Sequence, residues 1–201
     1  MLFMLCACAS ENNDSSTDGS NAESTVAASS QEESRVLISS SSLTSPLGID
    51  TYSSAAKYCT SENKYVNVPV KLTSLVRGKD AEKELKSYAE STPSFTYKAP
   101  EKGTEWVLIE YSMNLDSFPT DKKGIDNSIT AFVTDKGGEG LVLNGKQWST
   151  TPVNMTDGKY YFYGEVSGKT AFLMIKDKKD FVIALGEFGE TQAYFSPSVK
   201  S

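Results

Sequence analysis

The sequence predicts an all-β fold of antiparallel strands, a sandwich or a barrel, with one short helix and a disordered segment before the folded part. Runs of β-branched and aromatic residues recur at short intervals from Tyr65 to Phe195. Turn-forming pairs such as Asn-Gly and Asp-Gly separate these runs. Before Gly48 the composition differs, because no aromatic residue occurs between Phe3 and Tyr52. The chain therefore divides into an N-terminal part without a core and one domain, residues 48–201.

Residues 1–8 resemble the end of a bacterial lipoprotein signal, in which an apolar stretch leads to the pattern Leu, two small residues, Cys. The match is Leu5-Cys6-Ala7-Cys8. It implies that Cys8 is diacylated, and Cys6 is the weaker candidate because Leu5 is too large for the position before the cleavage site. A usual signal has about 7 to 15 apolar residues behind a basic start, so we expect Met1 to lie inside a longer signal. The alternative is a hydrophobic N-terminus without this role.

Residues 9–47 are expected to form a disordered tether. They are rich in Ser, Asn, Asp and Glu, so they cannot bury enough apolar surface to offset the entropy lost on ordering. Six acids and one base lie before residue 48, which leaves 20 acids and 19 bases of the chain's 26 and 20 for the domain. A nearly neutral domain without a cluster of Lys and Arg argues against nucleic acid as a partner.

The first predicted strand spans residues 65–72, where Val66, Val68, Val70 and Leu72 alternate with other residues. Pro69 cannot donate a hydrogen bond to a neighbouring strand, which indicates a strand at a sheet edge. A short amphipathic helix follows at residues 80–88 and lies across a sheet end. Its apolar residues Ala81, Leu85 and Tyr88 have helical spacing, and Asp80 is placed to cap it.

The central predicted strand is Trp106 to Leu115. Its odd-numbered residues from Val107 to Leu115 are apolar and should face the core, whereas the opposite side is half apolar and includes Trp106 and Leu108. Further strands are predicted at residues 128–134, 140–143, 159–166, 170–176, 181–188 and 192–195. Turns are predicted between them at residues 135–138, 144–145, 157–158, 167–168 and 177–180.

Four segments in order carry a resemblance to a known group of domains. They are Pro-Leu-Gly at 46–48, Leu-Thr-Ser-Leu-Val-Arg-Gly at 72–78, Lys-Asp-Ala at 79–81, and Pro-Glu-Lys-Gly-Thr-Glu-Trp at 100–106. This order resembles the immunoglobulin-like domains of unknown function in Gram-positive lipoproteins, similar in fold to a secreted mycobacterial immunoprotective antigen. The similarity covers most of residues 46–196. It implies an antiparallel immunoglobulin-like sandwich and an extracellular location, and it brings no catalytic residues.

The sequence contains no histidine, which removes Ser-His-Asp and Cys-His nucleophile systems and most imidazole metal sites. Cys59 stands alone in the domain, so no disulfide can form within it, and it is interpreted as a small buried residue. We expect no cofactor. The pair Asp177 and Asp180 suggests a calcium site, but Lys178 and Lys179 between them favour a solvated turn.

A pair of carboxylates remains as possible catalytic chemistry, because cleavage of a glycosidic bond needs only two acids at a defined separation. Glu110, Glu165 and Glu187 each fall within a predicted strand. Alternation places Glu110 on the side opposite the core, so the simpler interpretation is a solvated strand face.

The run of aromatic residues from Tyr160 to Tyr163 is the feature most typical of a recognition surface. Alternation buries either Tyr160 and Phe162 or Tyr161 and Tyr163, and leaves two rings on the other side. With Trp148 on a neighbouring hairpin, Tyr161 and Tyr163 are the candidates for a surface that binds a carbohydrate or a protein. Burial of both sides is the alternative.

Together these features predict an exported protein, anchored by lipid on the outer face of the cell membrane, with a non-catalytic domain that binds or presents. Two alternatives remain. One is an exported carbohydrate-active hydrolase that uses paired carboxylates, and the other is an inhibitor or sensor of an extracellular enzyme.

Overall fold

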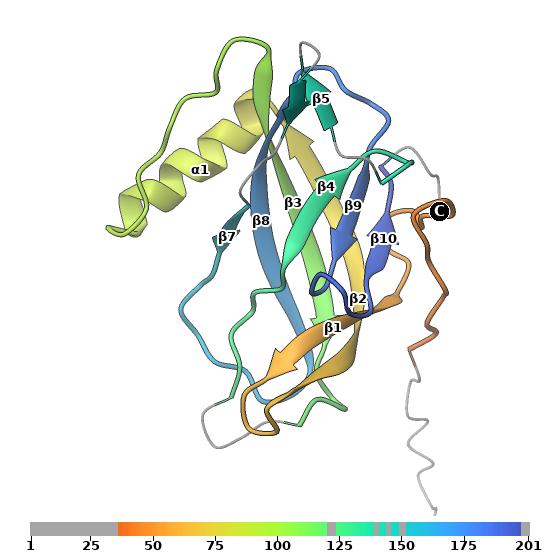
Figure 1. Ribbon diagram of the computed structural model, residues 1–201. Helices are drawn as coiled ribbons and strands as arrows, with labels where there is room; N and C mark the ends of the chain where they lie inside the picture. The colour runs from red at the N-terminus through yellow and green to blue at the C-terminus, as the bar shows by residue number, and fades with distance from the viewer. Residues whose placement is uncertain (1–35, 120–123, 139–140, 144–145, 149–151, 198–201) are drawn as a thin grey trace, which may run out of the picture. The chain divides into compact units, whose positions relative to one another are not determined.

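A computed structural model describes residues 36–119, 124–138, 141–143, 146–148 and 152–197 (Figure 1). In these ranges the elements are β1 Ser53–Cys59, β2 Lys64–Arg77, α1 Lys79–Ser91, β3 Thr104–Asn114, β4 Ala131–Thr134, β5 Leu141–Leu143, β6 Lys146–Trp148, β7 Val153–Met155, β8 Glu165–Ile175, β9 Val182–Leu185 and β10 Ala193–Phe195. The predicted lipidation residue Cys8 and most of the predicted tether lie outside the described residues.

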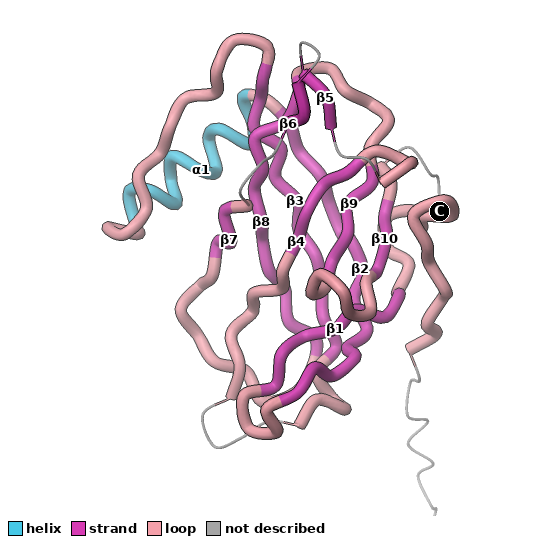
Figure 2. The backbone as a smooth tube through the Cα atoms, viewed as in Figure 1, coloured by secondary structure: helices cyan, strands magenta, loops and turns pink. Residues whose placement is uncertain are grey.

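The fold is mostly β, with two main antiparallel sheets and one short helix (Figure 2). One sheet has five strands in the order β1-β2-β3-β8-β7, and the other has three in the order β10-β9-β4. Strands β5 and β6 form a separate two-stranded hairpin. The prediction of antiparallel strands with one helix is confirmed.

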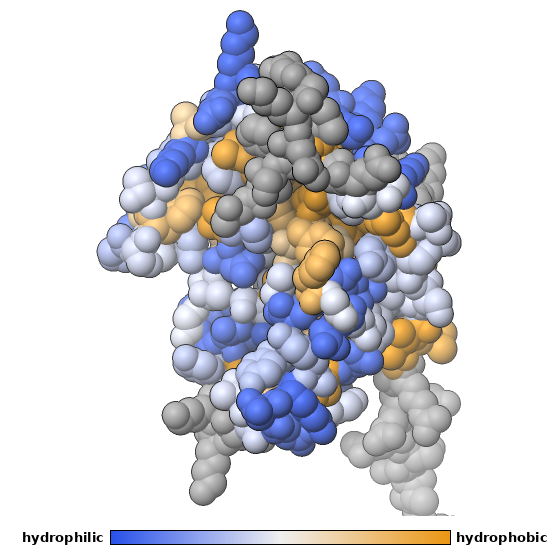
Figure 3. All heavy atoms as spheres, in the orientation of Figure 1, coloured by the Kyte–Doolittle hydropathy of each residue, from blue (hydrophilic) through white to orange (hydrophobic). Residues whose placement is uncertain are grey.

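The surface turned to the viewer in Figure 3 is largely hydrophilic, with hydrophobic residues in small separate areas.

The main core lies between the two sheets and is built on the inner face of β3. Val107, Ile109, Tyr111 and Met113 are fully buried there, and Leu115 just after the strand is buried with them. Both sheets contribute to this cluster, since β2, β8, β9 and β10 all supply buried apolar side chains. The predicted core face of this strand is confirmed, because strict alternation puts every second residue on one face.

Strand β8 runs through Ser167-Gly168, where the sequence predicts a turn. In the register of β3 and β8, Gly168 stands opposite Tyr111. A β-carbon at Gly168 would lie 2.3 Å from the backbone oxygen of Asn127 and 2.5 Å from both Cε2 and the hydroxyl oxygen of Tyr111. The glycine therefore makes room for the buried Tyr111 ring, and the turn prediction was wrong.

Helix α1 packs on the outer face of the five-stranded sheet, on the left in Figure 1. Its buried residues Ala81 and Leu85 join a second cluster with Trp106 and Leu108 of β3, as the predicted helical spacing requires. The predicted cap is wrong, because Gly78 occupies the N-cap and no side chain there donates or accepts a capping bond. Asp80 lies in the first turn, where its charge favours the helix dipole.

The interpretation of Pro69 as a mark of an edge strand is wrong for the strand as a whole. Strand β2 lies between β1 and β3. Pro69 pairs with Ser54 of β1, and the pairing of β2 with β3 begins only at Val70. Pro69 therefore lies where β2 has a partner on one side only, so the missing N–H breaks no bond to β3.

The predicted tether ends too late in the sequence. Leu47 forms a parallel bridge with Phe195 of β10, and its backbone bonds to Tyr194 O and Ser196 N at 2.9 Å each. Ser41 Oγ accepts a hydrogen bond from Tyr194 N at 3.0 Å. Residues 36–47, which we call the strap, are thus held against the folded part by backbone bonds that a composition argument does not detect.

The predicted strand at residues 159–166 is also wrong. Tyr160 to Gly164 form a loop in which Tyr161 makes an isolated bridge to Ile125, and β8 begins only at Glu165. Strands β4, β5, β9 and β10 fall within predicted ranges with shorter limits, whereas β1, β6 and β7 were not predicted. Among the described residues, α1 with its 13 residues is the one α-helix, and it lacks the length and apolarity to cross a membrane.

Candidate functional site

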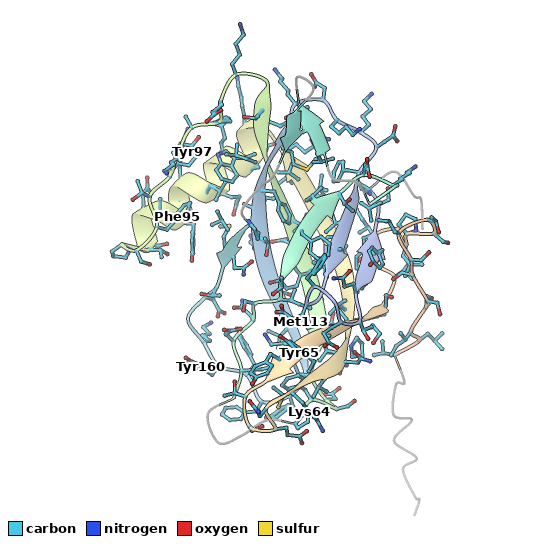
Figure 4. The ribbon with its side chains drawn as sticks, viewed as in Figure 1. Lys64, Tyr65, Phe95, Tyr97, Met113 and Tyr160 are labelled. Atoms are coloured by element: carbon cyan, nitrogen blue, oxygen red, sulfur yellow. The ribbon has the colours of Figure 1, made fainter. Side chains whose placement is uncertain are left out.

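Two features of the described surface can support binding: a group of exposed aromatic rings at one end of the domain, and a groove beside α1. The rings belong to Tyr58, Tyr65, Tyr160, Phe162 and Tyr163, and we call this group the aromatic end. Figure 4 labels Tyr65 and Tyr160 at the same end of the domain, near the turn between β1 and β2.

The β1–β2 hairpin supplies the first two rings. Tyr58 and Tyr65 are direct partners in the register, and their ring centroids lie 5.2 Å apart in an edge-to-face arrangement. The Tyr58 hydroxyl donates to Asn63 Oδ1 at 2.5 Å, which fixes the ring against the turn. Cross-strand aromatic pairs of this kind stabilise a hairpin, so the two rings are held in place before any partner binds.

The loop before β8 supplies the other three rings. Tyr160, Phe162 and Tyr163 are exposed by 66%, 44% and 78%. Tyr161 between them packs partly against the main core, and its hydroxyl donates to Asp157 Oδ2 at 2.5 Å. Gly124 lies against this loop, since a β-carbon there would be 2.8 Å from Tyr161 O. Tyr161 therefore anchors a loop that presents its neighbours to solvent.

The structure brings together only part of the predicted recognition surface. Tyr163 is exposed as required, whereas Tyr161 is half-buried and serves as the anchor. Trp148 belongs to β6, which Figure 2 places at the end of the domain opposite the Tyr160 labelled in Figure 4. The side chain of Trp148 lies outside the described part. The prediction missed Tyr58 because it missed β1, although the β1–β2 pairing places that ring beside Tyr65.

The groove beside α1 lies between the second half of the helix and the outer face of β3 and β8, and it encloses about 550 Å³. This volume is within the range of about 300 to 1,000 Å³ typical of small-ligand sites. Its lining consists of Glu84, Ser87, Tyr88, Ser91, Thr92, Glu110, Asn127, Met155, Thr156, Asp157, Ser167, Gly168 and Lys169.

Lys169 is the central charge of this groove. Its Nζ lies 2.8 Å from Glu110 Oε1 and 3.4 Å from Glu84 Oε2, so one ammonium group bridges two carboxylates. The hydrogen bond to Glu110 raises the pKa of Lys169, and the same bond lowers the pKa of Glu110. Asp157 accepts hydrogen bonds from the Tyr161 hydroxyl and from Lys159 N, and the first of these lowers its pKa. Lys169, Glu110 and Asp157 are therefore charged at neutral pH.

The three carboxylates from which a catalytic pair was considered all contact neighbouring groups. Glu110 also accepts a hydrogen bond from Ser74 Oγ at 3.0 Å. Glu165 accepts a hydrogen bond from Ser112 Oγ at 2.6 Å and forms an ion pair with Lys71 at 3.0 Å. Hydrogen bonds, first from Ser112 and then from Lys71, lower the pKa of Glu165.

Glu187 was predicted to lie within a strand, but it lies after β9. It accepts a hydrogen bond from Thr130 Oγ1 at 2.5 Å. The carboxylates of Glu110 and Glu165 stand on the outer sheet face, as alternation predicts, whereas Glu187 lies in a turn apart from them.

A smaller hollow of about 180 Å³ surrounds Lys57 of β1. The Lys57 ammonium donates to Ser128 O and lies 3.2 Å from Asp126 Oδ1, and its side chain is only 11% exposed. Burial lowers the pKa of Lys57 against the opposing effect of Asp126. Because both acceptors of Lys57 come from one loop, we interpret this contact as the bond that holds residues 126–128 against β1.

Asp177 and Asp180 each contact neighbouring groups of the chain. Asp177 has a positive φ of 62°, which is typical of a turn, and its N–H donates to Glu105 Oε1 at 3.1 Å. Asp180 lies 3.9 Å from Lys136. Within the described ranges no three His, Cys, Asp or Glu side chains cluster as metal ligands would. Cys59 is buried as expected, with its sulfur 3.0 Å from Pro119 O.

Comparison with protein-family models, with curated proteins and with solved structures gave no match. The resemblance to immunoglobulin-like lipoprotein domains therefore stays a prediction from the sequence segments described above.

Proposed function

We propose that this chain is a non-catalytic surface protein, anchored by lipid, whose immunoglobulin-like domain binds an extracellular protein or carbohydrate through the aromatic end. The proposal is carried by the exposure of five aromatic side chains in the β1–β2 hairpin and the loop before β8, which lie at the same end of the domain (Figure 4). Tyrosine and phenylalanine are enriched at binding surfaces, because they supply large contact areas with few rotatable bonds. The paired and anchored rings described above lose little freedom on binding, which supports a preformed surface.

Pull-down from an extract of the cell envelope, with the full chain as bait, tests this function. An interface tyrosine that carries binding energy costs at least about 1 kcal/mol when it is truncated, so replacing Tyr160 or Tyr163 with Ala should weaken capture by at least about 5-fold. Phe188→Ala is the matched control, because Phe188 is 88% exposed and packs with Phe132 outside the aromatic end. Equal losses from the control variant, or none from Tyr163→Ala, would contradict the proposal. A glycan array distinguishes a carbohydrate partner from a protein.

The anchor is proposed from Leu5-Cys6-Ala7-Cys8. Two acyl chains give stable membrane attachment, because each buried methylene contributes about 0.8 kcal/mol. Cells labelled with a fatty-acid probe should yield labelled protein in the detergent phase, and Cys8→Ser should abolish the label. Cys6→Ser is the control and should keep it. Label that persists in Cys8→Ser would refute Cys8 as the anchored residue, and unlabelled wild-type protein would refute the anchor.

The absence of catalysis is proposed because of the state of the carboxylates. A general acid in glycoside cleavage needs a raised pKa, whereas the pKa values of Glu110 and Glu165 are lowered by their hydrogen bonds. Incubation of the protein with cell-wall glycans should give no release of reducing ends. Turnover that disappears in Glu110→Gln would replace this proposal with the hydrolase.

A further inference from the structure

The groove beside α1 is a second place where a ligand can bind, separate from the aromatic end. Its floor is formed by paired strands β3 and β8, and one wall is formed by α1, whose Ala81 and Leu85 are fully buried against the sheet. Both boundaries are regular elements fixed by packing, so the groove exists before a ligand arrives.

The charges in the groove argue against an anionic ligand. Among the described residues, three carboxylates and one ammonium line it, so the charge of this part of the lining is negative. Lys169, the only cation among these residues, is already bound to Glu84 and Glu110. A phosphate or carboxylate ligand would have to displace one of these two partners and then face the carboxylate left unpaired, which is costly.

The remaining groups of the lining suit a ligand that carries many hydroxyls and no charge. Each carboxylate has about four acceptor sites, and the described contacts of Glu84 and Glu110 use only some of them. The hydroxyls of Ser87 and Ser167 can donate or accept. Uncharged hydroxyls can therefore add hydrogen bonds to the carboxylates without breaking the ion pairs, and charge-assisted bonds of this type are the stronger ones.

One wall of the same groove is apolar. The Tyr88 ring contributes to it and is held by the Phe95 ring, whose centroid lies 5.4 Å away. Met155 on β7 belongs to both the groove lining and the apolar cluster under α1. A sugar ring combines a rim of hydroxyls with a face of C–H groups, and the latter packs on an aromatic ring.

We propose that this groove binds an uncharged oligosaccharide, with hydroxyls on Glu84, Glu110 and Lys169 and a sugar face on Tyr88. The inference goes beyond the proposed function, because it uses residues outside the aromatic end.

The test is titration of the full chain, followed by amide NMR shifts and calorimetry. The neutral probes are chitotetraose, cellotetraose and maltotetraose, and the comparison probes are a heparin tetrasaccharide and a tetralysine peptide. At least one neutral probe should bind and shift amides of residues 84–92 and 167–169. Binding only of the heparin fragment or the peptide, or no shift with any neutral probe at millimolar concentration, would overturn the inference.

Two variants make the assignment specific. Ser167→Trp fills the groove from an exposed position of β8 and leaves the ion pairs intact, whereas Lys169→Met removes the central donor. Each should weaken binding by at least about tenfold. Lys136→Ala is the control, because Lys136 is an exposed residue beyond β4 that pairs only loosely with Asp180, and its affinity should stay within about twofold. Unchanged affinity in Ser167→Trp would refute the site.

The two groove variants replace no residue of the aromatic end and leave the contact between Asp157 and Tyr161 in place. Ser167→Trp should leave capture of the envelope partner unchanged, so failure of the oligosaccharide titration and failure of the pull-down can be told apart.

Discussion

Replacement of Gly168 by Ala tests the packing of the central strands. Alanine is usually preferred to glycine in a strand, because alanine lowers the conformational entropy of the unfolded chain. This effect stabilises the folded protein by about 0.4–1 kcal/mol. Here the added β-carbon would lie 2.3 Å from Asn127 O and 2.5 Å from the Tyr111 hydroxyl. Neither neighbour yields easily, since one is backbone and the other is a fully buried ring. We therefore expect Gly168→Ala to destabilise the folded protein.

The magnitude follows from two costs. Overpacking of a core costs about 1 to 3 kcal/mol. Displacement of the Tyr111 hydroxyl also weakens its bonds to Asn127 O and Ile129 N, both 3.1 Å long, at about 1 kcal/mol each. We expect a loss of about 3 kcal/mol, which at a slope of about 2 kcal/mol/M lowers the urea midpoint by about 1.5 M.

Urea unfolding followed by tryptophan fluorescence measures this change. Gly103→Ala is the control, because its β-carbon would meet nothing within 4 Å although its φ is +89°. This variant should be destabilised only by the strain of an alanine in a left-handed backbone conformation, about 1 to 2 kcal/mol. If Gly168→Ala is as stable as the wild type, or loses no more than Gly103→Ala, then the close approach of β8 to Tyr111 is refuted.

Two further predictions concern stability. Burial raises the pKa of Tyr111 to about 12 from 10.0, so the native state keeps a proton that the unfolded state loses, and stability should fall as the pH rises from 10 to 12. In Tyr111→Phe, the free energy of unfolding should decrease less between pH 10 and 12. An unchanged dependence on pH would contradict the role of Tyr111. Removal of residues 1–35 should leave the urea midpoint unchanged, whereas removal of residues 1–47 should cost about 2 to 3 kcal/mol, because the backbone bonds of Leu47 and Ser39 are lost. Equal midpoints for the two truncations would show that the strap adds nothing.

The parts of the fold that the sequence predicts are those with strong periodicity. Every odd-numbered residue from Val107 to Leu115 is apolar, so the buried inner face of β3 could be predicted directly. The helix was found because Ala81 and Leu85 lie four residues apart beside charged neighbours. Its cap was not predicted, because Gly78 directly after β2 is the N-cap and Asp80 lies inside the first turn.

Other elements were missed because their signal depends on contacts between distant segments. Strand β1 consists largely of small residues such as Ala55 and Ala56, which carry little strand preference and are buried by pairing with β2. In the sequence, Ser167-Gly168 has the composition of a turn, and Gly168 is explained by the Tyr111 ring opposite it.

Only part of the candidate site could be predicted, because the rest depends on contacts between distant segments. Tyr163 is exposed, but alternation does not apply to residues 160–163 because they form a loop anchored by Tyr161. The groove could not be predicted, since it joins the helix residue Glu84 to Lys169 of β8, 85 positions away in the sequence.

The strap also affects how this protein meets other copies of itself. Strand β10 is the last of its sheet, and a strand in that position offers its unpaired backbone groups to any extended chain, which leads to aggregation. Here Tyr194 N, Tyr194 O and Ser196 N are bound by Ser41 and Leu47. The strap thus closes this side of the sheet to intermolecular pairing, which matters if the protein is anchored among identical neighbours on a membrane, as we propose.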